Sequence, residues 1–160
     1  MQPNGTFHSQ TYGTCSLTEL RRVVKSYLKA QADRSYRLVI GTDSQRKNSS
    51  ETDFVTALVI HRVGAGGIYF WTRMVESKRY VLRDRMYQEA LYSLRAADEF
   101  IELFKKDSLK FDLEIHVDIG GTGPTREMIG EIVGMIRSSG FRVKTKPESF
   151  AASKVADRHT

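Results

Sequence analysis

Two carboxylates stand at the ends of two short apolar segments, and these residues have the type and spacing to do chemistry. Residues 38–43 read Leu-Val-Ile-Gly-Thr-Asp and end on Asp43, whereas residues 115–121 read Ile-His-Val-Asp-Ile-Gly-Gly and break after Asp118 into a glycine-rich turn. Short β-branched, apolar runs of this kind are typical of strands. Because ligand sites form outside the carboxyl ends of parallel strands, we expect both side chains at one edge of a sheet.

Two further acids follow the same order along the chain. Glu89 lies in the first half of the helical pattern at 82–105, and Asp157 lies in a short helix expected after Pro147. Carboxylate oxygens are hard ligands that suit Mg²⁺ or Mn²⁺ better than zinc. Two such ions about 4 Å apart can activate a water and stabilise the leaving oxygen of a phosphodiester. The four acids, which would repel one another without metal, therefore predict metal-dependent hydrolysis.

Each acid also has a plainer interpretation. An aspartate after a strand is often only a turn or cap residue, and Asp157 could be a solvated chain end. Glu89 could be a surface helix residue, with Glu76, Glu99 or Glu102 as the acid of that region instead. What favours a shared site is the order of the four acids, which is strand, helix, strand and helix.

Hydrophobic periodicity predicts the elements that must position these acids. A capping box at 16–19 opens an N-terminal helix over 16–31, and residues 1–15 are expected to be a loose lead-in. The predicted strands are 36–43, 54–60, 68–75, 111–117 and 141–146; the later helices are 82–105, one from Pro124 to Gly140, and a last short one. We predict an α/β domain over 1–160 with a mixed five-stranded sheet, its first three strands an antiparallel meander, and helices on both faces.

Composition narrows the class of protein. The chain has 160 residues and no apolar run near the roughly 20 residues of a membrane span, and its N-terminus lacks the pattern of a signal peptide. Its single cysteine, Cys15, fits a reducing compartment, so we expect a cytoplasmic protein. The net charge of +6 favours a polyanionic partner such as nucleic acid.

Three motifs resemble one known family. They are residues 40–45 (Ile-Gly-Thr-Asp-Ser-Gln), residues 116–120 (His-Val-Asp-Ile-Gly) and residues 146–160, which end in Lys-Val-Ala-Asp-Arg-His-Thr. Together with the order of strands and helices, they resemble the YkuK-type family, an uncharacterised branch of the ribonuclease H-like superfamily of nucleases and resolvases. The resemblance extends over residues 36–160, and its last motif is the most specific.

The resemblance implies roles for particular residues. Asp43 would bridge two Mg²⁺ or Mn²⁺ ions, Glu89 and Asp118 would complete one metal site, and Asp157 would complete the other. The implied substrate is RNA, an RNA–DNA hybrid or structured DNA, and resolvases of the superfamily suggest a homodimer. Cationic residues expected to contact nucleic acid are Lys78, Arg79, Arg83, Arg142, Lys144, Lys146 and Lys154. Accessory residues of the site are Ser44, Gln45, His116, Gly120, Gly121 and His159, the last in a tail that would by default be frayed.

Two other functions remain open. Residues 118–122 also resemble the phosphate loop of sugar kinases with an actin-like core, which would make the protein a phosphotransferase. In those kinases the motif opens a hairpin and two domains surround a cleft, whereas here a helical pattern follows and the chain has only 160 residues. The other alternative is a non-catalytic module that binds nucleic acid without Mg²⁺-dependent cleavage.

Overall fold

The fold is a seven-stranded mixed sheet in the order β2-β1-β5-β4-β3-β6-β7. It is known from a computed structural model that describes residues 6–107, 112–121, 123 and 126–159, with the backbone alone at 152–154 and 157. The strands are β1 (Phe7–Ser9), β2 (Gly13–Cys15), β3 (Tyr36–Arg46), β4 (Thr52–Arg62), β5 (Gly67–Glu76), β6 (Asp112–His116) and β7 (Arg142–Lys144). The helices are α1 (Leu17–Ala30), α2 (Leu82–Phe104) and α3 (Ile129–Ser138), with short helical turns η1 (Arg126–Met128), η2 (Ala151–Ala156) and η3 (Asp157–His159).

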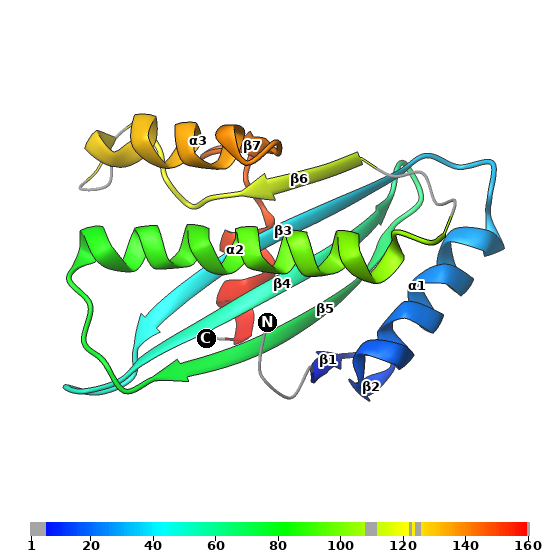
Figure 1. Ribbon diagram of the computed structural model, residues 1–160, viewed down its shortest axis with the longest axis horizontal. Helices are drawn as coiled ribbons and strands as arrows, with labels where there is room; N and C mark the ends of the chain where they lie inside the picture. Colours follow the sequence, from blue (N-terminus) through cyan, green and yellow to red (C-terminus); the bar gives the residue numbers. More distant parts are fainter. Residues whose placement is uncertain (1–5, 108–111, 122, 124–125, 160) are drawn as a thin grey trace.

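The three long strands form the predicted antiparallel meander. β3 pairs with β4 along all of its length, and β4 pairs with β5. Strand β6 then adds to the other side of β3 in the parallel sense, and β7 adds in parallel to β6. The mixed sheet is therefore confirmed, and β3 lies between β4 and β6, with the carboxyl end of β6 beside it (Figure 1).

The number of strands differs from the prediction of five, because residues 1–15 are not simply a lead-in. β1 and β2 pair with each other, and β1 joins the sheet at His8, opposite Trp71 of β5. Phe7 and Cys15 are almost fully buried and hold these strands against the main core. Strands of three residues are too short to show a period of two in the sequence.

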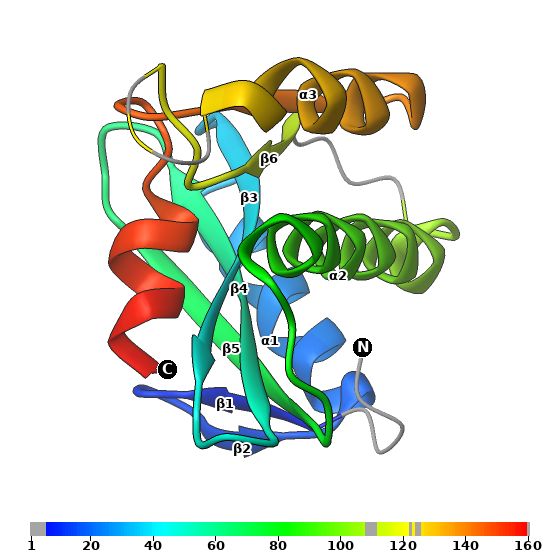
Figure 2. The same ribbon diagram turned by 90° about the vertical axis from the view of Figure 1, so that its left-hand side faces the viewer.

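Helices and helical turns cover both faces of the sheet, as predicted. The main core lies between one face and the helices α1, α2 and α3. The C-terminal turns η2 and η3 lie across the opposite face (Figure 2), where Ala156 packs on Val55 and Ala57 in a second, smaller cluster. The β3 residues Val39, Gly41 and Asp43 belong to this second face because side chains alternate along a strand.

Two details of the helices differ from the expectation or lie outside it. In α2, spacing by four from Ala97 predicts Ile101 on the buried side, but Phe100 and Phe104 are buried there and Ile101 is 45% exposed. The predicted start of the following helix at Pro124 lies outside the described residues, and α3 itself begins at Ile129 after η1. None of the helices in the described part of the chain is long and apolar enough to cross a membrane.

Candidate functional site

Asp43, inside β3, and Asp118, two residues after the end of β6, lie side by side where β6 leaves the sheet. The parallel register sets Gly41 opposite His116. Continued by two residues, this register sets Asp43 beside Asp118, where the paired part of β6 has already ended. Both aspartates are partly buried. The N-terminus of α2 and the turn that follows β6 lie at the same end of the molecule (Figure 1).

Helix α2 adds Glu89 to this site. The Glu89 side chain is buried and accepts a hydrogen bond of 2.5 Å from the Ser44 hydroxyl. One helical turn further on, the Ser93 hydroxyl bonds to the Thr42 hydroxyl at 2.8 Å. Residues spaced by four lie on one side of a helix, so these two bonds hold that side of α2 on the end of β3. Of the two hydroxyls on β3, Ser44 is a predicted accessory residue of the site and Thr42 is not.

The three acids share one electrostatic environment. Burial, together with the negative charges of Asp43 and Asp118, raises the pKa of Glu89 to about 8. The hydrogen bond from Ser44 and the charge of Arg85 act in the opposite direction. Glu89 is therefore mostly protonated at neutral pH in the absence of a cation. Of the acids on α2, Glu89 is the buried one that senses both aspartates, which favours it over Glu99 or Glu102.

Asp118 is held by the segment that follows β7. The Lys146 ammonium lies 3.2 Å from Asp118 Oδ1, an atom that is buried and has no well-aligned hydrogen bond among the described residues. The Lys146 backbone N–H also donates to the Ile119 carbonyl at 2.8 Å. A Cβ atom at Gly120 would lie 3.2 Å from Lys146 Cβ, so glycine permits this close approach. Lys146, expected to contact nucleic acid, thus partners an acid of the site.

His116 anchors the segment that leads to Asp157. Its Nδ1 accepts the backbone N–H of Phe150 at 3.0 Å, and the ring meets the Phe150 ring edge-on. Burial, followed by the charges of Lys144 and Arg37, lowers the pKa of His116 to about 4. The imidazole is therefore neutral, and since Nδ1 accepts, we assign its proton to Nε2. His116 acts here as a positioning residue for the C-terminal segment.

The C-terminal turns are anchored at their far end, although a frayed tail was the default expectation for His159. The His159 ring stacks on Trp71 at 4.4 Å between centroids, and Arg73 donates to the His159 carbonyl. Ala156 packs on Val55, which is the β4 partner of Asp43. The backbone of Asp157, the residue after Ala156, therefore lies near Asp43. The side chain of Asp157 lies outside the described part of the structure.

The expected nucleic-acid contacts divide into three groups. Arg142 and Lys144 are exposed on the edge strand β7, and Lys144 precedes Lys146 by two residues. Before and within the start of α2, Lys78 lies over the Tyr80 ring and Arg83 pairs with Glu131 at 2.9 Å, whereas Arg79 is exposed. The side chain of Lys154 lies outside the described part.

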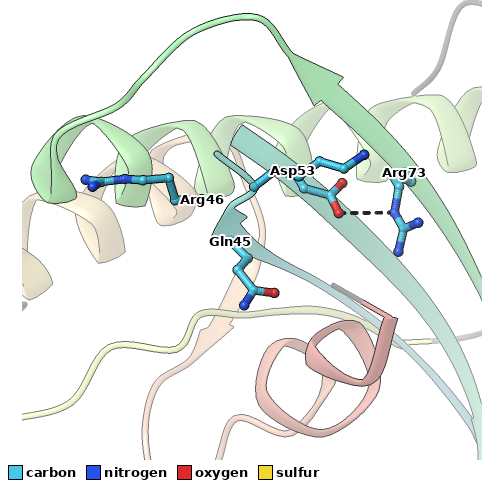
Figure 3. A pocket seen from close by; sticks show the side chains of 5 residues that line it. Gln45, Arg46, Asp53 and Arg73 are labelled. Carbon is cyan, nitrogen blue, oxygen red and sulfur yellow. Dashed lines mark ion pairs between the residues drawn. The ribbon is translucent and has the colours of Figure 1, made fainter. Parts of the chain in front are cut away.

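A pocket that sequence reasoning missed lies beyond Asp43 on the same face. It has a volume of about 350 Å³ and is lined by Gln45, Arg46, Lys47, Asp53 and Arg73 (Figure 3). The strand predicted over 36–43 is too short, because β3 continues to Arg46. The alternation of Asp43 and Gln45 was the available signal, because it puts both side chains on one face.

The donor atoms of the site suit a hard cation, but they are not gathered around one point. Asp43, Glu89 and Asp118 offer carboxylate oxygens, the ligands preferred by Mg²⁺ and Mn²⁺, and Asp118 Oδ1 is a buried acceptor without a well-aligned donor. Over the described residues, from which the Asp157 side chain is missing, no three His, Cys, Asp or Glu side chains are grouped closely enough to hold an ion as they stand. Ion binding would therefore require Lys146 and Ser44 to release their carboxylates.

Comparisons with known proteins agree with this architecture. A family model described as "Ribonuclease H-like" matches residues 19–160. The chain is 30% identical over 169 aligned positions to "Uncharacterized protein YkuK" of Bacillus subtilis (strain 168), and the alignment covers 96% of each protein. A search of the solved structures gave no significant match.

Proposed function

The chain belongs to the ribonuclease H-like family, and from this premise we propose that it is a metal-dependent nuclease with Asp43, Glu89, Asp118 and Asp157 as its acidic site. The observation that carries the proposal is the position of Glu89, whose side chain is 6% exposed and bonded to the Ser44 hydroxyl, where burial and the charges of both Asp43 and Asp118 raise its pKa. Acids drawn from three separate elements into one such environment cost stability unless a cation compensates them. Perturbed acids of this kind concentrate at functional sites.

The residues of the chain have distinct parts in the proposed activity. A bound Mg²⁺ or Mn²⁺ ion, or a pair of them, would supply an activated water and stabilise the charge of the leaving oxygen. Asp43 and Asp118 would hold it from adjacent chain segments, with Glu89 and Asp157 as further ligands. Ser44 fixes the orientation of Glu89, and His116 positions the segment that carries Asp157. Arg142 and Lys144, exposed beyond Asp118, would contact phosphates of the nucleic acid.

A specific observation keeps the non-catalytic module as the second candidate. Lys146 pairs with Asp118 and compensates its negative charge. Glu89 is mostly protonated at neutral pH and is therefore mostly uncharged. A protein that binds nucleic acid without using a metal would keep this arrangement. The phosphotransferase alternative has less support, because the chain after Gly121 leads to η1 and α3 and not into a hairpin.

The test is a cleavage panel with matched variants. Single-stranded RNA, RNA–DNA hybrid, duplex DNA and a four-way DNA junction are incubated with Mg²⁺, Mn²⁺ or EDTA. Asp43→Asn is compared with wild type and with Asp98→Asn, which removes an exposed acid of α2. We expect cleavage of at least one substrate that needs metal, is lowered about a hundredfold or more by Asp43→Asn, and is unchanged in the control.

Two outcomes would contradict the nuclease proposal. Equal cleavage by wild type and Asp43→Asn would mean that the activity does not come from this site. Metal-independent binding of nucleic acid with no cleavage of any substrate would favour the non-catalytic module. A rise in thermal stability with Mg²⁺ that Asp43→Asn abolishes would still assign the metal to the site in that case.

A further inference from the structure

The pocket beyond Asp43 continues the proposed active site along the sheet. Gln45 follows Asp43 by two residues, which places their Cα atoms about 7 Å apart on the same face of β3. Gln45 pairs with Asp53 of β4, and Val55, the partner of Asp43, pairs with Arg73 of β5. Directly paired residues present their side chains on one face of the sheet. A nucleic-acid strand that passes Asp43 would therefore run over this pocket.

Cations face the pocket. Arg73 Nε lies 3.3 Å from Asp53 Oδ2. Burial raises the pKa of Asp53, and the positive charges of Arg73 and Lys47 oppose this shift. The Arg73 side chain keeps 39% of its surface exposed, and Lys47 is exposed. The Arg46 guanidinium points away from the Asp53–Arg73 pair (Figure 3). Two cations against one acid leave a positive charge that suits a phosphate.

One acceptor in the pocket is left without a donor. The Asp53 side chain is only 8% exposed, and while Oδ2 is paired with Arg73, its Oδ1 is buried with no hydrogen-bond partner among the described residues. A buried polar atom in this state destabilises a protein unless a ligand or water satisfies it. A ligand hydroxyl is a suitable partner, because an ionised carboxylate only accepts hydrogen bonds.

We propose that this pocket holds a ribonucleotide unit of the substrate strand, with Lys47 and Arg73 on a phosphate and Asp53 Oδ1 accepting the hydrogen bond of a 2′-hydroxyl. The inference deepens the proposed function by naming RNA as the preferred strand. DNA lacks this hydroxyl and would leave Oδ1 unpaired, and a site built to bond a hydroxyl rejects the analogue without it. Gln45 adds an amide that can donate to the same phosphate.

The test measures binding by the full-length protein in EDTA, so that no cleavage occurs. Fluorescence anisotropy is recorded with a single-stranded RNA, the DNA of the same sequence and the 2′-O-methyl RNA, which has no hydroxyl hydrogen to donate. We expect wild type to bind RNA about tenfold more tightly than the other two, as for a hydrogen bond to a charged group. This comparison needs no variant and cannot be affected by misfolding.

Three variants then separate the two kinds of contact. Lys47→Gln and Arg73→Gln should weaken RNA and DNA binding equally and lower the slope of log affinity against log salt by about 0.7 each. Asp53→Ala should bring the RNA-to-DNA affinity ratio close to one without weakening DNA binding, because it removes a negative charge. Lys29→Gln, which removes an exposed lysine of α1, should leave the ratio unchanged.

The inference is overturned if wild type binds the three oligonucleotides equally, or if Asp53→Ala keeps the preference for RNA. These results are independent of the nuclease proposal. An inactive protein with the expected RNA preference would support the pocket and refute the nuclease, whereas an active nuclease without the preference would refute only the pocket.

Discussion

The buried carboxyl of Glu89 should make the protein less stable as the pH rises. The pKa of Glu89 is raised from an ordinary 4.5 to about 8 in the folded state. Between these values the folded protein binds more protons than the unfolded chain, so the free energy of unfolding falls with increasing pH. The stabilising contribution is fully present below pH 4.5 and is lost as the pH rises through 8.

The magnitude follows from the two pKa values. Each pH unit between them corresponds to about 1.4 kcal/mol, so the interval from 4.5 to about 8 amounts to about 5 kcal/mol. Glu89 is 6% exposed, and solvent therefore screens little of this effect. This loss equals the lower end of the free energies of unfolding of natural domains, which is about 5 kcal/mol.

The assay is urea unfolding of wild type and Glu89→Gln from pH 5 to pH 9 in EDTA. Glutamine keeps an oxygen that can accept from Ser44, but it does not ionise. We expect the stability of Glu89→Gln relative to wild type to increase with pH, by up to about 5 kcal/mol at pH 9. Asp98→Asn, on the exposed side of α2, is the control and should follow the wild-type curve. Asp43→Asn should show a smaller loss than wild type, because one of the charges that raise the pKa of Glu89 is gone.

The reasoning is refuted if the stability curves of wild type and Glu89→Gln are parallel over this range. Glu89 would then ionise equally easily in the folded and unfolded states. It would not be the buried member of a shared acidic environment, and the main support for the proposed nuclease site would be lost.

Two further predictions concern the C-terminal segment. Burial lowers the pKa of His116 from 6.5 to about 4, so about 3 kcal/mol of stability present above pH 6.5 should be lost as the pH falls to 4. In urea unfolding, His116→Asn should lack this loss at acid pH, although its amide oxygen can still accept the Phe150 N–H. An equal loss of stability at acid pH in the variant and in wild type would contradict the role of the ring. Trp71 is the single tryptophan and stacks on His159, so His159→Ala should shift its emission to longer wavelength and increase iodide quenching, whereas an unchanged spectrum would show that the stack does not form in solution.

The sequence was sufficient for the parts of the fold that local patterns encode. The three long strands, α2 and the turn that carries Asp118 after β6 followed from patterns within single segments, whereas Asp43, predicted to end its strand, lies inside β3, which continues to Arg46. The family resemblance is confirmed by the match over residues 19–160 and by the relative at 30% identity. The roles of the four acids in metal binding and cleavage stay predictions for the experiments above.

Contacts between distant segments could not be predicted from local patterns in the sequence. β1 and β2 are strands because Phe7 and Cys15 fill the core beside β5. A segment of three residues is too short for its sequence pattern to predict this packing. The pocket of Asp53 and Arg73 exists because residues 20 apart in the chain lie side by side in β4 and β5. The ion pair of Lys146 with Asp118 likewise joins residues 28 apart.

Side-chain alternation and helical periodicity depend on consecutive residues alone. The sequence by itself therefore determined which acidic residues could lie at one edge of the sheet. Only the tertiary structure decided their environment. Burial, the approach of Asp43 and Asp118, and the bond from Ser44 set the pKa of Glu89, and each of these depends on the distance between elements far apart in the chain. The charge state of a carboxyl responds to the free energy of its surroundings, which is why the sequence could name Glu89 but could not predict that it is protonated.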